Sequence, residues 1–237
     1  YIYDHTDLEP APEDYRDADR RMGEKGIVVA GLPPVPLVCL QAEVMGTENW
    51  CEGLMQHPEE FDELHDSLAR LYRRRLELAA DSPAEVIWFA DSLTGALVPP
   101  HLFDGYCKDF YDYGCRLLRQ AGKRTFAHFD GDNLAIKDCI AATDIDGIEA
   151  FTPPPMGPMT VAEARDAWPD KTVSLNFPGN LFSCPEDEIA RYTAQYLEEG
   201  GRDGHFVIGC TEEFPRHEFD RTFSTIARTM NDFESIA

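Results

Sequence analysis

Short apolar runs alternate with longer amphipathic stretches along most of the 237-residue chain. The runs are rich in β-branched and aromatic residues and are almost continuously hydrophobic, which is typical of parallel strands buried on both faces. The predicted strands span residues 35–41, 85–91, 125–130, 146–151, 172–177 and 205–210. A further apolar run over residues 28–32 is either another short strand or part of the connection into the first one.

The stretches between these runs predict helices. Phe61, Leu64, Leu68 and Leu71 repeat with a period near 3.6 residues, as the apolar face of a helix does, and the same period recurs over residues 103–117. Strand–helix–strand repetition predicts parallel pairing through right-handed crossovers. The chain is therefore expected to have an α/β fold.

Capping boxes are predicted at two helix starts. In one, Thr160 is followed by Glu163, and in the other, Ser183 is followed by Glu186. Both pairs combine a hydroxyl that accepts from the first turn with a carboxylate that accepts from the cap, so both predict where a helix begins.

Two architectures fit the alternation, an open doubly wound sheet and a closed (β/α)8 TIM barrel. No GxGxxG or GxxxxGK[ST] motif follows the first predicted strand, so a dinucleotide site or a P-loop has no support. Nearly every predicted strand ends in a group that can bind or react, and a barrel carries its chemistry at those ends. We therefore expect a barrel, as a single domain over residues 1–237 that lacks about two N-terminal strands.

Composition restricts the class of partner. The chain has 21 Lys and Arg against 44 Asp and Glu, a formal net charge of −23. This charge disfavours nucleic acids and anionic membranes and suits small molecules or proteins. The longest uncharged run, residues 26–42, contains three prolines, so no membrane span is predicted. Seven scattered cysteines without a CxxC pattern favour a reducing, cytoplasmic location.

The candidate chemistry lies at the predicted strand ends. In chain order the polar groups there are Gln41, Glu43, Asp91, His128, Asp130, Glu149, Asn176, Asn180, Cys210 and Glu212. Because the carboxyl ends of parallel strands meet at one edge, these side chains are expected to share one mouth.

Three of these groups match the ligands that zinc prefers. His128 and Asp130 are two residues apart on one predicted strand, so both side chains point to the same face. With Cys210 they would supply imidazole, carboxylate and thiolate to Zn²⁺ and leave one position open. Glu149 is a further ligand or a partner of His128. Two other interpretations stay open: an Asp before Gly131 often forms a turn, and a free cysteine is often part of the core.

The other histidines and the loop after residue 151 give weaker signals. His205 opens the last predicted strand and is expected to be structural. Four histidines on polar loops or helix faces are expected to be solvated, namely His5, His57, His65 and His217. Residues 153–159, three prolines followed by Met-Gly-Pro-Met, predict a stiff loop or a lid over the mouth.

Several stretches, taken in order, resemble the uroporphyrinogen decarboxylase superfamily. They are Trp88-Phe89-Ala90-Asp91-Ser92, Pro99-Pro100-His101-Leu102-Phe103, Ala121-Gly122-Lys123, His128-Phe129-Asp130-Gly131, Gly147-Ile148-Glu149, Asn176-Phe177-Pro178-Gly179-Asn180 and Ile208-Gly209-Cys210-Thr211. The resemblance implies a (β/α)8 barrel with its site at the strand carboxyl ends. It also implies that the first part of the barrel is absent here, since members are usually longer at the N-terminus.

Two chemistries occur in this superfamily. Metal-free decarboxylation of uroporphyrinogen uses an N-terminal arginine-rich motif, an aspartate and a late histidine. Zinc-dependent methyl transfer between a corrinoid protein and a thiol such as coenzyme M uses ligands in a His-x-Cys…Cys pattern. Here the late position reads Gly209-Cys210 where the decarboxylases have Gly-His, which favours the methyltransferases. The earlier pair reads His128-x-Asp130 instead of His-x-Cys, and Asp is an acceptable zinc ligand.

The sequence therefore predicts a zinc-dependent methyltransferase with a corrinoid on a partner protein. The expected metal ligands are His128, Cys210, Asp130 and Glu149, and the expected catalytic residues are Asp91, Asp130 and Asn176. The alternative is decarboxylation of a porphyrinogen or another small acid, in which Asp91 or Asp130 stabilises a protonated pyrrole. Few Lys or Arg lie near the predicted strand ends, which disfavours a polyanionic porphyrinogen. A third hypothesis is a non-catalytic barrel that binds a small molecule or a corrinoid carrier.

Overall fold

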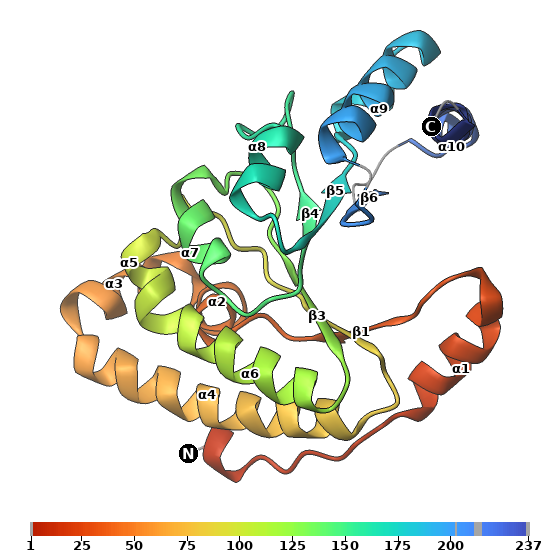
Figure 1. The fold of residues 1–237 in the computed structure, drawn as a ribbon. Helices are drawn as coiled ribbons and strands as arrows, with labels where there is room; N and C mark the ends of the chain where they lie inside the picture. Colours follow the sequence, from red (N-terminus) through yellow and green to blue (C-terminus); the bar gives the residue numbers. More distant parts are fainter. Residues whose placement is uncertain (1, 202, 211–214, 236–237) are drawn as a thin grey trace. The chain divides into compact units, whose positions relative to one another are not determined.

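The structure, a computed structural model, describes residues 2–201, 203–210 and 215–235, and it divides into two compact units (Figure 1). The first unit comprises Tyr1–Leu93, Leu97–His128 and Ala142–Asp146, and the second comprises Thr94–Ala96, Phe129–Ala141 and Gly147–Ala237. Both alternate parallel strands with helices, so the predicted α/β class is confirmed. None of the helices among the described residues is both long and apolar enough to span a membrane.

Three parallel strands form the sheet of the first unit. They are β1 (Val29–Leu32), β2 (Val86–Phe89) and β3 (Arg124–His128), with β2 in the middle. Val86 pairs with Val29 on one side and Arg124 on the other, so the three strands start at the same level. The predicted strands over residues 85–91 and 125–130 are therefore confirmed as β2 and β3.

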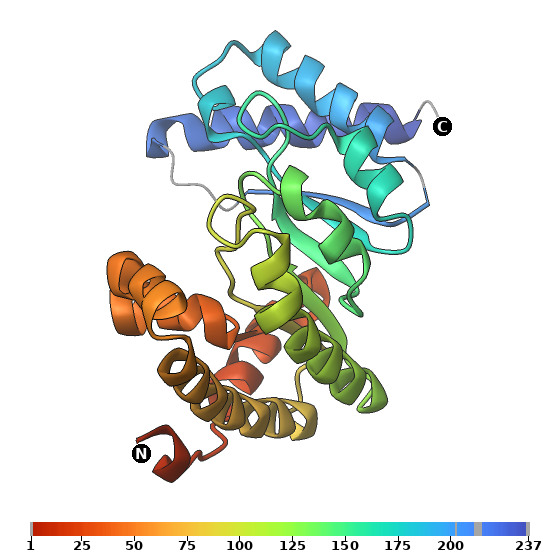
Figure 2. The same ribbon diagram turned by 90° about the vertical axis from the view of Figure 1, so that its left-hand side faces the viewer.

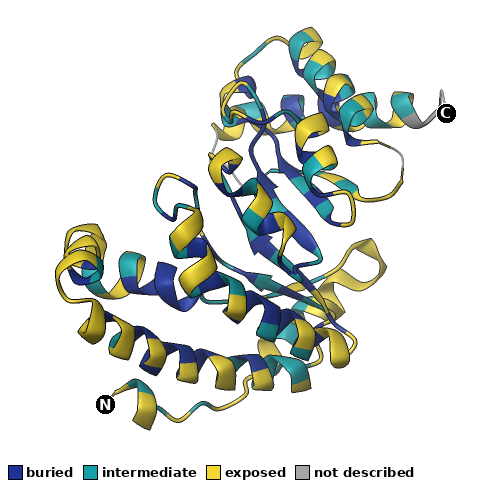
Figure 3. Ribbon diagram, turned by 60° about the vertical axis from the view of Figure 1, so that its left-hand side comes forward, coloured by how far each residue is buried: buried dark blue, intermediate teal, exposed yellow. Residues whose placement is uncertain are grey.

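Long helices cover this sheet. The helices of the first unit are α1 (Glu13–Met22), α2 (Pro36–Cys39), α3 (Gly46–Gln56), α4 (Pro58–Asp81), α5 (Pro100–Leu102) and α6 (Lys108–Gln120), with π-helical turns η3 (Leu40–Met45) and η4 (Phe103–Cys107). Helices α4 and α6 lie side by side (Figures 1 and 2). One side of α4 is buried and the other exposed, as its apolar period predicted (Figure 3). His65 was expected to be solvated, and this is wrong: the residue is 8% exposed and its ring packs against Tyr106.

The predicted strand over residues 35–41 is also wrong, because this segment is helical. Pro36 occupies the first turn of α2, a position that suits proline because its missing N–H has no helical acceptor there. Leu37 and Val38 are buried in all directions, and a short apolar run of this kind reads the same in a strand and in an enclosed helix. The strand at this point of the chain is β1, within the run over residues 28–32.

The described part of the second unit also contains three parallel strands. They are β4 (Gly147–Phe151), β5 (Thr172–Asn176) and β6 (Phe206–Gly209), with β5 in the middle, which confirms the last three predicted strands. The pairing of β4 shifts register between Ile148 and Phe151, where Ala150 has a φ of 60°. A non-glycine residue in this region is uncommon, and such irregularities are often found beside functional sites.

Among the described residues of the second unit, four helices accompany these strands. They are α7 (Lys137–Ala141), α8 (Val161–Ala167), α9 (Glu186–Gly200) and α10 (Phe219–Ser235). Helices α9 and α10 pack along each other (Figure 2). The capping box of Thr160 and Glu163 is present at the start of α8. The one predicted at Ser183 is absent, since α9 begins directly after Pro185 without a side-chain cap.

Candidate active site

The carboxyl ends of the strands in the second unit hold most of the predicted site. Asn176 pairs with Gly209, so it is level with the residue that precedes Cys210. The backbone N–H of Phe129 donates to the carbonyl of Glu149 at 2.9 Å. Because β5 and β6 are parallel and in register, Asn176 and the residue before Cys210 lie at the same edge of these strands.

These side chains differ in how far they are enclosed. The Asn176 side chain is almost completely buried, with 1% of the residue exposed. Asp130, Glu149 and Cys210 are half-buried, and Cys210 forms no disulfide. An enclosed amide is suited to orienting a group that reaches it, whereas the half-buried carboxylates and thiol can meet a ligand from solvent.

Hydrogen bonds fix the loop that carries Asp130. Gly131, with a φ of 74°, donates its N–H to the Thr152 hydroxyl at 3.2 Å. The Asn133 amide donates to the Phe129 carbonyl at 2.7 Å, and its Oδ1 is buried without a hydrogen-bond donor among the described groups. Asp130 is thus presented by a backbone held on both sides. Sequence reasoning gave no role to Asn133, because its burial depends on contacts that the local pattern does not contain.

The stiff loop predicted after β4 is present. The N–H groups of Met156 and Gly157 both donate to the Pro153 carbonyl, and Tyr196 donates its hydroxyl to the Pro154 carbonyl at 2.7 Å. A Cβ on Gly157 would lie 1.8 Å from the Thr152 carbonyl oxygen, so only glycine fits. The loop therefore has one tightly specified conformation, which leaves the Met156 side chain half exposed.

Asp91 and His128 belong to the first unit. Asp91 is fully buried, and its carboxylate accepts the Val35 N–H at 2.6 Å and the Tyr111 hydroxyl at 2.7 Å. Burial raises the pKa of Asp91 to about 6, and the two hydrogen bonds and the nearby His128 oppose that rise. The ring of His128 meets Trp88 edge to face, with the ring centres 5.7 Å apart. These contacts make Asp91 the anchor between the end of β2 and the start of α2.

A further polar group in the first unit was not predicted. Tyr72 donates its hydroxyl to Cys39 Sγ at 3.0 Å, and that thiol lies 3.6 Å from a Glu43 carboxylate oxygen. Burial raises the pKa of the Cys39 thiol, so it is protonated at neutral pH. Cys39 and Glu43 are four residues apart, a spacing that brings side chains together only in a helix, and the strand prediction therefore concealed the pair.

The predicted metal ligands are divided between the units. His128 ends β3 in the first unit, whereas Asp130, Glu149 and Cys210 lie in the second. Within the part of either unit that the structure describes, no three His, Cys, Asp or Glu side chains gather as a metal-binding group. The donors themselves suit Zn²⁺, since they offer one imidazole nitrogen, one sulfur and carboxylate oxygens. Glu212 lies outside the described residues.

Comparison with solved structures finds a protein of the same fold. A methyltransferase from Methanosarcina mazei matches with a TM-score of 0.71 at 16% sequence identity, covering 91% of this chain and 63% of the other. The chain thus spans less than two thirds of that protein. A proposed orotidine 5′-phosphate decarboxylase from Streptomyces avermitilis matches with a TM-score of 0.44 at 14% identity, covering 88% and 72% of the two chains. This second score is too low to support an argument about the fold.

Sequence comparison identifies the family. A search of curated proteins gives no match. The family model described as uroporphyrinogen decarboxylase (URO-D) matches residues 34–211, which include every candidate site residue from Asp91 to Cys210. That match covers most of the chain and agrees with the ordered motifs around Asp91, His128, Asn176 and Cys210. The chain belongs to the uroporphyrinogen decarboxylase family.

Proposed function

We propose that this protein transfers a methyl group between a corrinoid protein and a thiol. The proposal rests above all on Cys210, a half-buried cysteine outside any disulfide that follows β6, next in the chain to the residue that pairs with the enclosed Asn176. In the decarboxylases that the sequence resembles, this position is a histidine. The segments 129–133, 152–156 and 177–181, which follow β3, β4 and β5, contain no Lys or Arg. A porphyrinogen with many carboxylates would find no cation there.

We further propose that His128, Cys210 and either Asp130 or Glu149 hold Zn²⁺. When bound, Zn²⁺ lowers the pKa of a thiol, so that a thiolate is present at neutral pH. The carboxylate of Asp130 or Glu149 that is not a ligand accepts the proton of the substrate thiol. The Asn176 amide orients the thiol's polar end. Asp91, which is fully buried with its carboxylate already hydrogen-bonded, acts through the connection between β1 and α2 that it fixes.

The methyl step balances without an added oxidant. The thiolate sulfur attacks the methyl carbon, a carbon–sulfur bond forms, and the cobalt–carbon bond breaks with its electron pair left on cobalt. The corrinoid protein is the partner that supplies this methyl group. None of the seven cysteines, all of which lie among the described residues, forms a disulfide, and this supports a cytoplasmic, reducing location for the reaction.

Metal content tests the ligand assignment. Protein purified without chelator is analysed by inductively coupled plasma mass spectrometry, together with Cys210→Ser and His128→Ala. Cys51→Ser is the control, because Cys51 is an exposed cysteine on α3 and is not among the predicted ligands. We expect about one zinc per chain, lost in the first two variants and kept in the control. A folded parent without zinc, or unchanged zinc in Cys210→Ser, would contradict the assignment.

An activity assay separates the reactions. Methylcobalamin and a thiol are supplied, and loss of the cobalt–carbon bond is followed by visible absorbance with and without a chelator. Methyl transfer that the chelator abolishes supports the proposal. Chelator-insensitive release of carbon dioxide from uroporphyrinogen would instead identify a decarboxylase. Neither activity, with methylcobalamin still bound, would identify a non-catalytic carrier-binding protein.

A further inference from the structure

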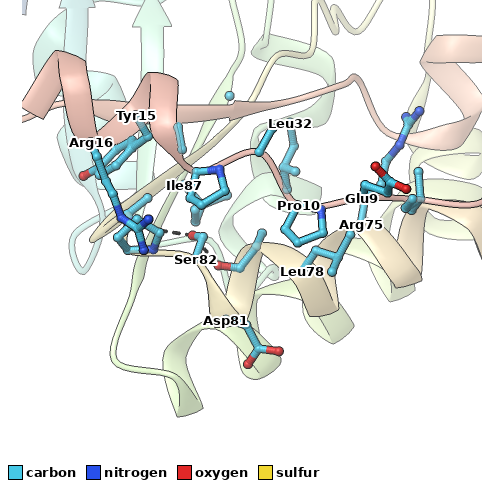
Figure 4. Close-up of a pocket in the computed structure, with 18 residues that line it drawn as sticks. Glu9, Pro10, Tyr15, Arg16, Leu32, Arg75, Leu78, Asp81, Ser82 and Ile87 are labelled. Atoms are coloured by element: carbon cyan, nitrogen blue, oxygen red, sulfur yellow. Dashed lines mark hydrogen bonds between the residues drawn. The ribbon is translucent and has the colours of Figure 1, made fainter.

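A cavity of 640 Å³ lies in the first unit, apart from every residue of the candidate active site (Figure 4). Its walls come from three segments, namely the N-terminal stretch 8–16, strand β1, and the end of α4 with the turn into β2. That turn precedes β2, so the cavity is reached from the amino end of this strand. Its volume is within the range of small-molecule sites.

Most of the cavity wall is apolar. Figure 4 shows Pro10, Leu32, Leu78 and Ile87 in the middle of the cavity, between polar residues at its two ends. Ile87 is almost fully buried, so this middle region is continuous with the core beneath the sheet. A site of this kind gains affinity by removing apolar surface of a ligand from water.

Arg75 is the polar group that stands out at one end of the cavity. Its guanidinium lies 4.6 Å from the centre of the Tyr72 ring, and no described carboxylate is within ion-pair distance of it. The other arginines of α4 are used differently: Arg70 pairs with Asp4, and Arg74 donates to backbone carbonyls of the N-terminal segment. An arginine without an acidic partner is unexpected in a chain with 44 acidic and 21 basic residues. The half-buried Arg75 guanidinium therefore has N–H donors available for an anionic ligand.

The charges around Arg75 restrict the anion that it can accept. Glu9 lines the wall at the same end of the cavity in Figure 4. Its carboxylate would repel a doubly charged phosphate more strongly than a singly charged carboxylate. The second arginine, Arg16, lies at the opposite end and already pairs with Glu13 at 2.7 Å. One available guanidinium therefore suits one singly charged group.

We propose that this cavity binds an apolar monocarboxylic acid. The carboxylate accepts two hydrogen bonds from the Arg75 guanidinium, which the Tyr72 ring holds in place. The hydrocarbon body lies along Pro10, Leu32 and Leu78. The site is separate from the methyl-transfer chemistry proposed above and does not depend on it.

Isothermal titration calorimetry with decanoate tests the site, with decan-1-ol and decylamine as neutral and cationic probes of the same length. We expect decanoate to bind at least about tenfold more tightly than either, which corresponds to ~1.4 kcal/mol. Arg75→Gln should lower decanoate affinity to that of the alcohol. The matched control is Arg73→Gln, which removes an arginine of the same helix that stacks on Tyr113 outside the cavity, and it should bind decanoate like the parent.

Two more variants make the test specific to the cavity. Ala79→Phe places a ring in the wall and should abolish binding, while circular dichroism confirms that the variant is folded. Glu9→Gln removes a repelling carboxylate and should tighten decanoate binding. Equal binding of decanoate and decylamine, or full affinity in Arg75→Gln, would overturn the proposal. A folded parent that binds no decanoate and forms a dimer would show instead that a second copy fills the cavity, and would also overturn it.

Discussion

Replacement of Asp91 by asparagine should remove a pH dependence from the stability of the first unit. Asp91 is fully buried and accepts the N–H of Val35 and the hydroxyl of Tyr111. An asparagine can keep both contacts, because its Oδ1 accepts from Val35 while its Nδ2 donates to the Tyr111 oxygen. Asp91→Asn therefore removes the ionisable proton and reverses the hydrogen bond with Tyr111, whose hydroxyl proton loses Asp91 as its acceptor.

The sign and the size follow from the pKa of Asp91. Burial raises it from 3.8 to about 6 in the folded protein. Below about pH 4 the carboxyl is protonated in both states, so it adds no pH dependence. Between about pH 4 and 6 the folded state still holds the proton and the unfolded state has lost it, so stability falls as pH rises. Above about pH 6 the free energy of unfolding has fallen by about 3 kcal/mol and does not change further.

Urea unfolding between pH 4 and pH 7.5 measures this effect, with tryptophan fluorescence as the probe. We expect the free energy of unfolding of Asp91→Asn to exceed that of the parent by about 1–3 kcal/mol at pH 7.5. The two values should be equal near pH 4. Asp109→Asn, at an exposed position of α6, is the control and should follow the parent throughout. Parallel curves for Asp91→Asn and the parent would show that Asp91 is not held as a costly buried carboxylate, and the reasoning would fail.

Two further substitutions test the second unit. Gly157→Ala should lower its stability by more than about 2 kcal/mol, because the new Cβ would meet the Thr152 carbonyl oxygen, whereas Gly105→Ala, with open space around it, should leave the thermal midpoint unchanged or slightly higher. Thr160→Ala should cost about 1 kcal/mol in urea unfolding by removing the hydroxyl that caps α8, and retention of full stability would show that the Glu163 carboxylate alone satisfies the helix start.

The sequence predicted the strands best where a run is buried on both faces and ends in a polar group. Strands β4 and β5 meet this condition most fully, whereas β6 was found from its apolar run although Val207 is 49% exposed. The pairing of Asn176 with the residue before Cys210 agrees with these strand predictions. The segment over residues 35–41 is equally apolar, yet it is helical. A fully enclosed helix and a fully enclosed strand expose no alternation that could separate them. Pro36 was the one local signal for a helix start.

The contacts of the candidate site were harder to predict than its residues. Asp91 was found from its place after a strand, but Val35 lies 56 residues from it in the chain and Tyr111 lies 20 residues away. The helical period over residues 103–117 did not single out Tyr111, and a local period carries no information about a contact between a hydroxyl and a distant carboxylate. The prediction that His65 is solvated was wrong for the same reason, because its burial depends on Tyr106 from another helix.

The stiff loop after β4 has a consequence for how a ligand would be selected. Since its conformation is fixed by the Pro153 and Pro154 carbonyls and by the absence of a side chain at Gly157, little conformational entropy remains to be lost when a ligand arrives. A loop ordered in advance cannot adapt its shape to a poor fit. A ligand that fits poorly against Met156 would then bind with lower affinity from the first encounter. Hydrogen exchange of this loop would change little between the free and the bound protein.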